Sequence, residues 1–311
     1  MKELDYLFIN GALTAKSISL FRENEYQALV TSKMGFFKTL IDFGYTNLDY
    51  KSIDEVIEQG YVDLKEYLNS VTQSNEVITK FFFFRFDISN ILVLLKGKLI
   101  DKKGVLNNLG WFSQTDITNI LLLNDYTKLN DELEFFENIK LNCANLCSFQ
   151  LSNLVIKEGY KYIYDHIAIE NAGLLQYLDY EVTIKNILTL YRMKRLEGTI
   201  DALNDSIIPF GFIEKKVFEN LFNLGKDEIS SHLRNLFNTE FVDSLERLNQ
   251  TNNLEAFNRD LIRLKLYVLK DILRENEQLG ILLHYVFSKE LEFANIKSLY
   301  LDSDNLKNLI Y

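Results

Sequence analysis

The chain has 311 residues, 47% of them hydrophobic, which is enough for two or three modest domains with real cores. Its net charge of −10 argues against nucleic acid as a partner, because phosphate binding needs a cationic excess on the protein surface. With only 1 Pro and 13 Gly, few positions interrupt a helix, so the composition predicts an all-α protein without substantial sheet.

The start of the chain shows no sign of a secretory leader. Residues Met1 to Asp5 are followed by a mixed polar segment and not by a long apolar run. The sequence therefore predicts a protein that is made and kept in the cytoplasm.

Residues 81–98, FFFFRFDISNILVLLKGK, raise the question of a membrane span. A membrane-spanning helix needs about 20 predominantly apolar residues in a row. Arg85, Asp87, Asn90 and Lys96 interrupt this run, so we predict a helix of a protein without a transmembrane span.

An Asn-Ile pair in a helical context occurs three times and indicates an internal repeat. The pairs begin at Asn90, Asn186 and Asn295, which lie 96 and 109 residues apart. The residue three positions before the Asn is an acid in the first and third copies, Asp87 and Glu292, and a threonine in the second.

A second helical stripe precedes these helices in the same order. Ser113 and Asp116 have the form of a capping box, which predicts a helix start, and Gly110 and Gly211 fall where a turn is required. The apolar stripe of each copy recurs at matching helical offsets: Tyr26, Leu29 and Val30; Ile117, Ile120 and Leu121; Phe218, Leu221 and Phe222. Two elements in one order, three times, predict a triplicated helical unit of about 100 residues. This repeat map places modules at 1–105, 106–200 and 201–311.

The polar residues of the Asn-Ile helices form a candidate structural motif: Asp87, Asn90, Asn186, Glu292 and Asn295. An Asn within an apolar stripe can satisfy an unpaired backbone group at the end of another helix, whereas Leu cannot. We therefore interpret the motif as a packing and register device, with direct ligand contact as the alternative.

Basic residues follow the first two Asn-Ile pairs and are candidates for contact with a partner. They are Lys96 and Lys98 in the first copy, and Arg192, Lys194 and Arg195 in the second. In the last turn of a helix such cations oppose the helix dipole, and the second cluster suits an acidic partner surface. The third copy has no basic residue at the equivalent offsets.

No catalytic constellation is evident, and no cofactor is predicted. Gly225-Lys226 lacks the rest of a phosphate-binding loop, and there is no G-x-S-x-G motif. His166 with Glu170, and Glu228 with His232, are four residues apart, so a carboxylate-bridged metal site within a helical bundle can be imagined. Neither is a Glu-x-x-His pair.

The two cysteines, Cys143 and Cys147, lie four residues apart on a predicted helix. They lack the CxxC spacing of a zinc knuckle. We expect both to be reduced thiols in the core.

Three stretches give the chain a resemblance to a known family. They are residues 6–30 (YLFINGALTAKSISLFRENEYQALV), 86–98 (FDISNILVLLKGK) and 285–301 (YVFSKELEFANIKSLYL). In this order, across nearly the whole chain, they resemble the C subunit of the V-type/A-type ATP synthases, the prokaryotic counterpart of the d subunit of the vacuolar ATPase (V-ATPase). The third stretch is similar to the closing helix of that family through Tyr285, Lys289, Glu290, Glu292, Asn295 and Ile296. Family members usually keep a basic residue after the third Asn-Ile pair, where this chain offers only Lys297 close by.

The resemblance implies three similar helical modules in a pseudo-threefold funnel with a central cavity. The repeat map also allows the N- and C-terminal helices to be exchanged, so that they complete one another's module. It implies a non-catalytic component of the central stalk, peripheral on the cytoplasmic side of the membrane. The expected partners are the D and F subunits of the central shaft and the cytoplasmic face of the membrane rotor ring. Coupling these partners would link ATP hydrolysis or synthesis to proton or sodium transport.

Two further functions remain open at this point. A generic helical-repeat adaptor would bind another protein in its concave surface. A helical metalloenzyme would use His166 or His232 as a ligand.

Overall fold

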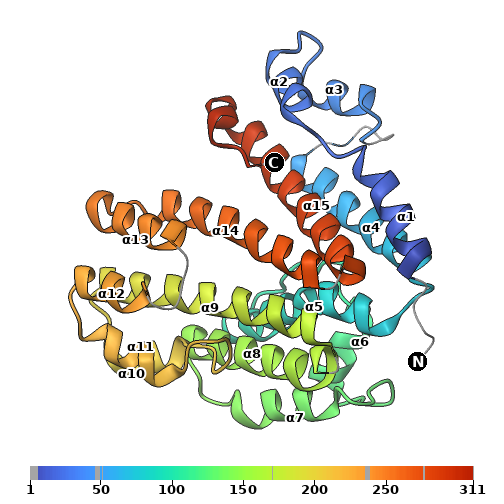
Figure 1. Cartoon of the computed structure of the whole chain (residues 1–311). Coiled ribbons are helices and arrows are strands. Elements are labelled where there is room, and N and C mark those ends of the chain that lie inside the picture. Colours follow the sequence, from blue (N-terminus) through green and yellow to red (C-terminus); the bar gives the residue numbers. More distant parts are fainter. Residues whose placement is uncertain are drawn as a thin grey trace. The chain divides into compact units, whose positions relative to one another are not determined.

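The computed structural model is built from helices (Figure 1). It describes residues 6–45, 50, 52–169, 171–234, 239–275 and 277–310, and no strand occurs in these ranges. The prediction of an all-α protein is confirmed. Because Pro and Gly are rare, long stretches keep helical dihedrals without interruption.

By its internal contacts the chain divides into two compact units. Residues 1–79 together with 273–311 form unit 1, and residues 80–272 form unit 2. The division into three modules with boundaries near 105 and 200 stays a prediction, as does the funnel with its cavity.

Unit 1 joins the two ends of the chain. The C-terminal helix α15 packs against α1, α2 and α4, and the blue and red ribbons lie side by side in Figure 1. Its elements are α1 (Tyr6–Ser17), α2 (Glu23–Thr31), α3 (Phe36–Asp42), α4 (Ile53–Val71), α15 (Glu277–Leu301) and the 3₁₀ helix η3 (Ser303–Asn308). One apolar cluster combines Phe21, Tyr26 and Leu40 with Ile296 and Leu299 of α15.

Unit 2 holds most of the remaining helices. In it α7 packs on α8, α9 contacts α10 and α11, and α12 pairs with α13. The elements are α5 (Glu76–Leu99, starting at the unit boundary), α6 (Gln114–Thr118), the π-helix η1 (Asn119–Leu123), α7 (Leu133–Asn142), α8 (Ser148–Tyr162), the π-helix η2 (Ile163–Ala168), α9 (Ala172–Arg195), α10 (Ile200–Ser206), α11 (Lys215–Phe222), α12 (Lys226–Leu233), α13 (Thr239–Thr251) and α14 (Leu254–Glu275, crossing into unit 1).

The phenylalanine run of α5 lies in the core of the protein. Phe81, Phe82, Phe83 and Phe84 are all buried, and the ring of Phe84 meets that of Phe135 edge-on at 5.3 Å between centroids. Among the described residues, no helix combines the length and apolar character needed to cross a membrane. The run is therefore explained by packing.

The predicted apolar stripes lie against the protein interior, as expected. Tyr26 and Leu29, Ile117 and Ile120, and Phe218 and Leu221 are buried in their three copies; Leu121 is buried as well, while Val30 and Phe222 are partly buried. The helix predicted from the capping box also starts as expected, because the Ser113 hydroxyl accepts from the Asp116 N–H at 3.1 Å and α6 begins at Gln114.

The expectation for the cysteines is wrong in two respects. Cys143 is partly buried and Cys147 is exposed, so neither is a core residue, although both are free thiols. They also do not share a helix, because Cys143 is the C-cap residue that follows α7 and Cys147 is the N-cap residue that precedes α8. The four-residue spacing spans a helix-to-helix turn.

Candidate functional site

On α5, the motif residues hold the turn that precedes α6. The carboxylate of Asp87, fully buried, accepts from the backbone N–H of Trp111 at 2.6 Å and of Phe112 at 3.1 Å. The side-chain amide of Asn90 pairs with both backbone groups of Asn107, donating to its carbonyl and accepting from its N–H, each at 3.0 Å. Two side chains on one face of α5 thus satisfy four backbone groups of a single loop.

On α9, the same arrangement holds the turn that precedes α11. The Asn186 amide donates to the Ile208 carbonyl at 2.8 Å and accepts from the Ile208 N–H at 2.9 Å. Three residues earlier, the hydroxyl of Thr183 accepts from the Phe212 N–H at 3.1 Å. Thr183 thus occupies the place that Asp87 takes on α5.

On α15, the motif holds the two ends of the chain. The carboxylate of Glu292 accepts from the Phe21 N–H at 2.6 Å, directly before α2, and also pairs with Lys289. The Asn295 amide donates to the carbonyl of Ile310 at 2.6 Å and to the Tyr26 hydroxyl at 3.3 Å. In the other two copies both backbone partners belong to one continuous loop. In this copy they belong to two separate segments, one before α2 and one after α15.

The residue after each Asn explains the second half of the Asn-Ile pair. Ile91, Ile187 and Ile296 are each fully buried. One helix position therefore supplies the hydrogen bonds to the neighbouring loop, and the next position supplies the apolar contact with the core.

The two predicted turn glycines lie directly against the motif. A side chain at Gly110 would overlap the carboxylate of Asp87, and a Cβ at Gly211 would lie 2.5 Å from the Thr183 hydroxyl. Gly211 also has φ +96°, a left-handed conformation that side chains disfavour. Glycine is needed because the backbone approaches the motif helix so closely.

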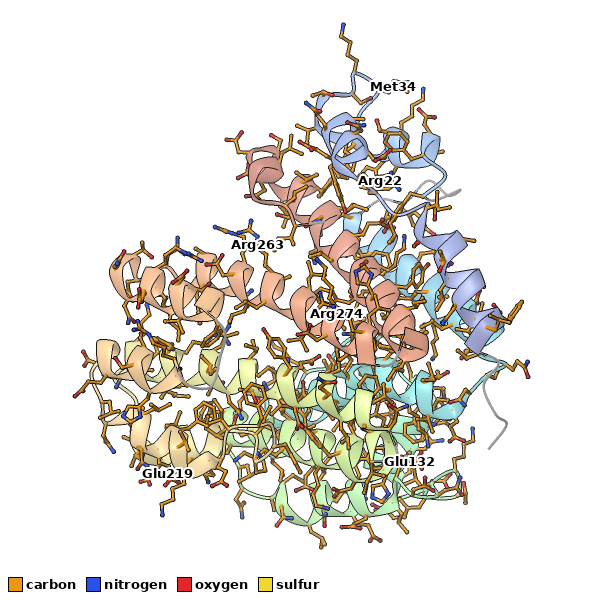
Figure 2. The ribbon with its side chains drawn as sticks, in the orientation of Figure 1. Arg22, Met34, Glu132, Glu219, Arg263 and Arg274 are labelled. Atoms are coloured by element: carbon orange, nitrogen blue, oxygen red, sulfur yellow. The ribbon has the colours of Figure 1, made fainter. Side chains whose placement is uncertain are left out.

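Sequence reasoning missed some of the polar residues that hold these elements together. Thr183 was passed over because it is not an acid, although its offset from Asn186 is the same as that of Asp87 from Asn90. A buried ion pair was also missed: Lys80 of α5 lies 2.7 Å from the carboxylate of Glu132, the N-cap residue of α7 labelled in Figure 2. Its partners are 52 residues apart, so no local spacing reveals it.

The predicted partner-contact cations fall into two groups. Lys98, Arg192 and Arg195 are exposed, and Lys96 is partly buried. Lys194 instead donates to the carbonyls of Phe222 at 2.6 Å and Leu224 at 2.7 Å, at the C-terminal end of α11. Burial lowers the pKa of its ammonium group. Lys194 therefore joins α9 to α11 within the chain.

The residues considered for a metal site lie in unremarkable surroundings. The ring of His166 stacks on Tyr162, and Glu170 lies outside the described residues. Glu228 accepts from the backbone N–H of Gly225 at 2.7 Å, and His232 is exposed. Within the described ranges, no group of three His, Cys, Asp or Glu side chains could hold a metal ion.

The motif therefore serves to fix backbone, and the comparison with known families gives it a context. A family model described as ATP synthase (C/AC39) subunit matches residues 9–300. The chain belongs to the ATP synthase (C/AC39) subunit family. A search among curated proteins finds no match.

Membership in the C/AC39 family confirms the resemblance inferred from the three sequence stretches. It makes the chain a subunit of a V/A-type rotary ATP synthase. The motif side chains of all three helices lie within the matched residues. Of their backbone partners in the described residues, only the carbonyl of Ile310 lies outside the match.

Proposed function

We propose that this C/AC39 protein is a non-catalytic part of the central stalk, a socket that couples the D/F shaft to the membrane rotor ring. The observation that carries the proposal is the family match over residues 9–300. Rotation driven by ATP hydrolysis would pass through the subunit to the ring, and ion flow would drive the reverse. The subunit would lie peripherally on the cytoplasmic side, and the ring would determine whether protons or sodium ions are carried.

The bonding of the described residues supports a mechanical role. An element that transmits torque must deform little, and stiffness comes from dense packing and from backbone groups that cannot open independently. In each motif, side chains of a long helix hold the backbone ahead of a shorter one, and the buried pair Lys80–Glu132 adds a further tie.

The test is reconstitution of the complete rotary complex with and without this subunit. Without it, we expect ATP hydrolysis to continue while ion pumping stops, and hydrolysis to lose its sensitivity to a carbodiimide that modifies the ring. Adding the purified subunit should restore both properties. Pumping that persists without the subunit would contradict the coupling role.

Co-purification distinguishes the adaptor alternative. A tagged chain expressed in its own host is expected to bring down the D and F subunits and the protein of the rotor ring. If it brings down neither shaft nor ring but a different protein, the helical-repeat adaptor is the better description.

A further inference from the structure

The turn after α5 differs in charge from the protein as a whole. Residues 96–105, KGKLIDKKGV, contain four lysines and a single acid, a local charge of +3 in a chain whose net charge is −10. Lys98, Lys102 and Lys103 are all exposed. We call residues 96–105 the lysine turn.

The backbone of the lysine turn is held in one conformation. Asp101 adopts the left-handed conformation with φ 51°, and the Lys102 N–H donates to the Gly97 carbonyl at 2.9 Å, which closes the end of α5. A side chain at Gly97 would overlap the Lys102 carbonyl, and one at Gly104 would overlap Val93. The turn therefore folds back closely onto α5, with its lysines at the surface.

That surface exposes large aliphatic side chains between the lysines. Leu99 is 50% exposed, Ile100 65% and Val105 92%. Three exposed aliphatic side chains within ten residues that also carry four lysines are an unusual combination, and such apolar exposure often marks a binding surface.

We propose that the lysine turn binds the interface of a bilayer that contains anionic lipids, with the aliphatic side chains inserted among the headgroups and the lysines contacting phosphate. Lysine side chains are attracted to the negative charge of anionic lipid headgroups. Their long aliphatic stems allow the ammonium groups to reach the headgroup phosphates while the neighbouring apolar side chains insert into the bilayer interface. The inference goes beyond the coupling role, because it concerns lipid and requires no other subunit.

The residue types favour lipid over a protein partner. Protein interfaces are enriched in arginine and aromatic residues and depleted in lysine. The lysine turn has lysines and aliphatic residues only, apart from its glycines and Asp101, with neither arginine nor an aromatic ring. The turn after α9 offers a contrast: Leu196 is 75% exposed there, but it lies beside Arg192 and Arg195.

The experiment is co-sedimentation of the purified full chain with vesicles. Vesicles of about one third phosphatidylserine in phosphatidylcholine are expected to bind the chain, and pure phosphatidylcholine is not. Binding to the anionic vesicles should weaken at about 0.5 M salt, since screening reduces the attraction of lysines to headgroups.

Two sets of variants test the residues. Replacing Lys98, Lys102 and Lys103 together by Glu is expected to lower binding by about a hundredfold or more. The double variant Ile100→Ser and Val105→Ser is expected to lower it about tenfold or more. Because all these side chains are exposed, the variants should keep the circular dichroism spectrum and melting temperature of the parent.

Matched controls carry the same chemical changes on other elements. The charge control replaces the exposed Lys33, Lys215 and Lys216 by Glu, and the apolar control replaces Leu123 and Leu141, which are 70% and 78% exposed, by Ser. Both are expected to lose much less binding than the turn variants.

Three outcomes would overturn the inference. They are absence of vesicle binding, equal loss in turn and control variants, and turn variants that bind vesicles normally but no longer bind the shaft or the ring. The last result would assign the turn to a protein partner. Failure here leaves the coupling proposal intact, because assembly and pumping of the rotary complex are measured separately.

Discussion

At the residue scale, the side-chain amides of Asn90 and Asn186 form the hydrogen bonds that a neighbouring backbone segment would otherwise form with the loop. A side-chain amide presents one carbonyl and one NH₂ group, so it can pair with both groups of a single residue as a neighbouring strand would. Asn90 and Asn186 do this to Asn107 and Ile208. A buried loop residue without such a partner would leave its N–H and carbonyl unpaired, which is costly.

Replacement of either asparagine by leucine is expected to destabilise the protein. Asn90→Leu and Asn186→Leu should each lower the free energy of unfolding by about 1–3 kcal/mol, because backbone groups lose their hydrogen-bond partners. Urea denaturation followed by circular dichroism measures the change. Asn108→Leu, at an exposed residue beside the held backbone, is the control and should change it little. A neutral result at Asn186 would remove its structural role.

The close approach of Gly211 to Thr183 gives a second prediction. Gly211→Ala should destabilise the protein by about 1–3 kcal/mol, because alanine is strained at positive φ and its methyl group would displace the hydroxyl that binds Phe212. The control is Gly11→Ala in α1, where a Cβ would meet nothing within 4 Å. There the same change should stabilise by about 0.5–1 kcal/mol. Equal melting temperatures for the two variants would refute the account.

At the element scale, α9 is tied to its neighbours by charge as well as by the motif. Glu181 of α9 accepts from the Tyr160 hydroxyl of α8 at 3.1 Å and pairs with Lys265 of α14 at 3.3 Å. Desolvation by burial raises the pKa of this carboxyl, but Lys265, Lys185 and Arg85 outweigh it and hold the pKa at about 2. The ionised form is therefore the one that stabilises the fold.

This lowered pKa predicts how stability depends on pH. An unfolded Glu has a pKa of about 4.3, so the stabilisation by Glu181 is present above that pH and is lost as pH falls towards 2. Glu181→Gln should lower the free energy of unfolding by about 1–3 kcal/mol at pH 7, and the difference from the parent should shrink towards pH 2. Denaturation at several pH values measures this; the partly exposed Glu219 of α11, labelled in Figure 2, provides a Glu→Gln control. A difference that does not vary with pH would contradict the assignment.

At the scale of the whole molecule, the two ends of the chain meet on one helix. The motif of α15 binds Phe21 ahead of α2 and also Ile310, so unit 1 joins segments that lie far apart in the sequence. Unit 2 contains two complete copies of the motif, each with its loop on the same stretch of chain.

The exposed cations of α9 give a prediction about assembly. Arg192→Glu with Arg195→Glu should leave stability unchanged and weaken binding to an acidic partner surface in the rotary complex, most at low salt. Lys194→Glu should instead destabilise the fold, because it removes two hydrogen bonds to the end of α11 and adds repulsion with carbonyl groups. Melting temperatures and pull-down of the D and F subunits at two salt concentrations separate the two effects. Binding that survives the double arginine change would exclude this cluster as an interface.

The sequence by itself determined the helical class, the apolar stripes and the recurrence of the Asn-Ile pair on three helices. Those properties depend on local periodicity and on residue types that stand out from their surroundings, such as an amide in an apolar stripe. Family membership also followed from motif order along the chain. What only the tertiary structure decided is which groups these side chains meet. The structure shows that Thr183 binds the backbone of Phe212 and that Lys194 binds the end of α11. It also shows that Lys80 pairs with Glu132 and that α15 binds segments from both ends of the sequence. All of these contacts join residues that are distant in sequence. Local spacing carries no information on such contacts, because the packing of whole helices brings the partners together.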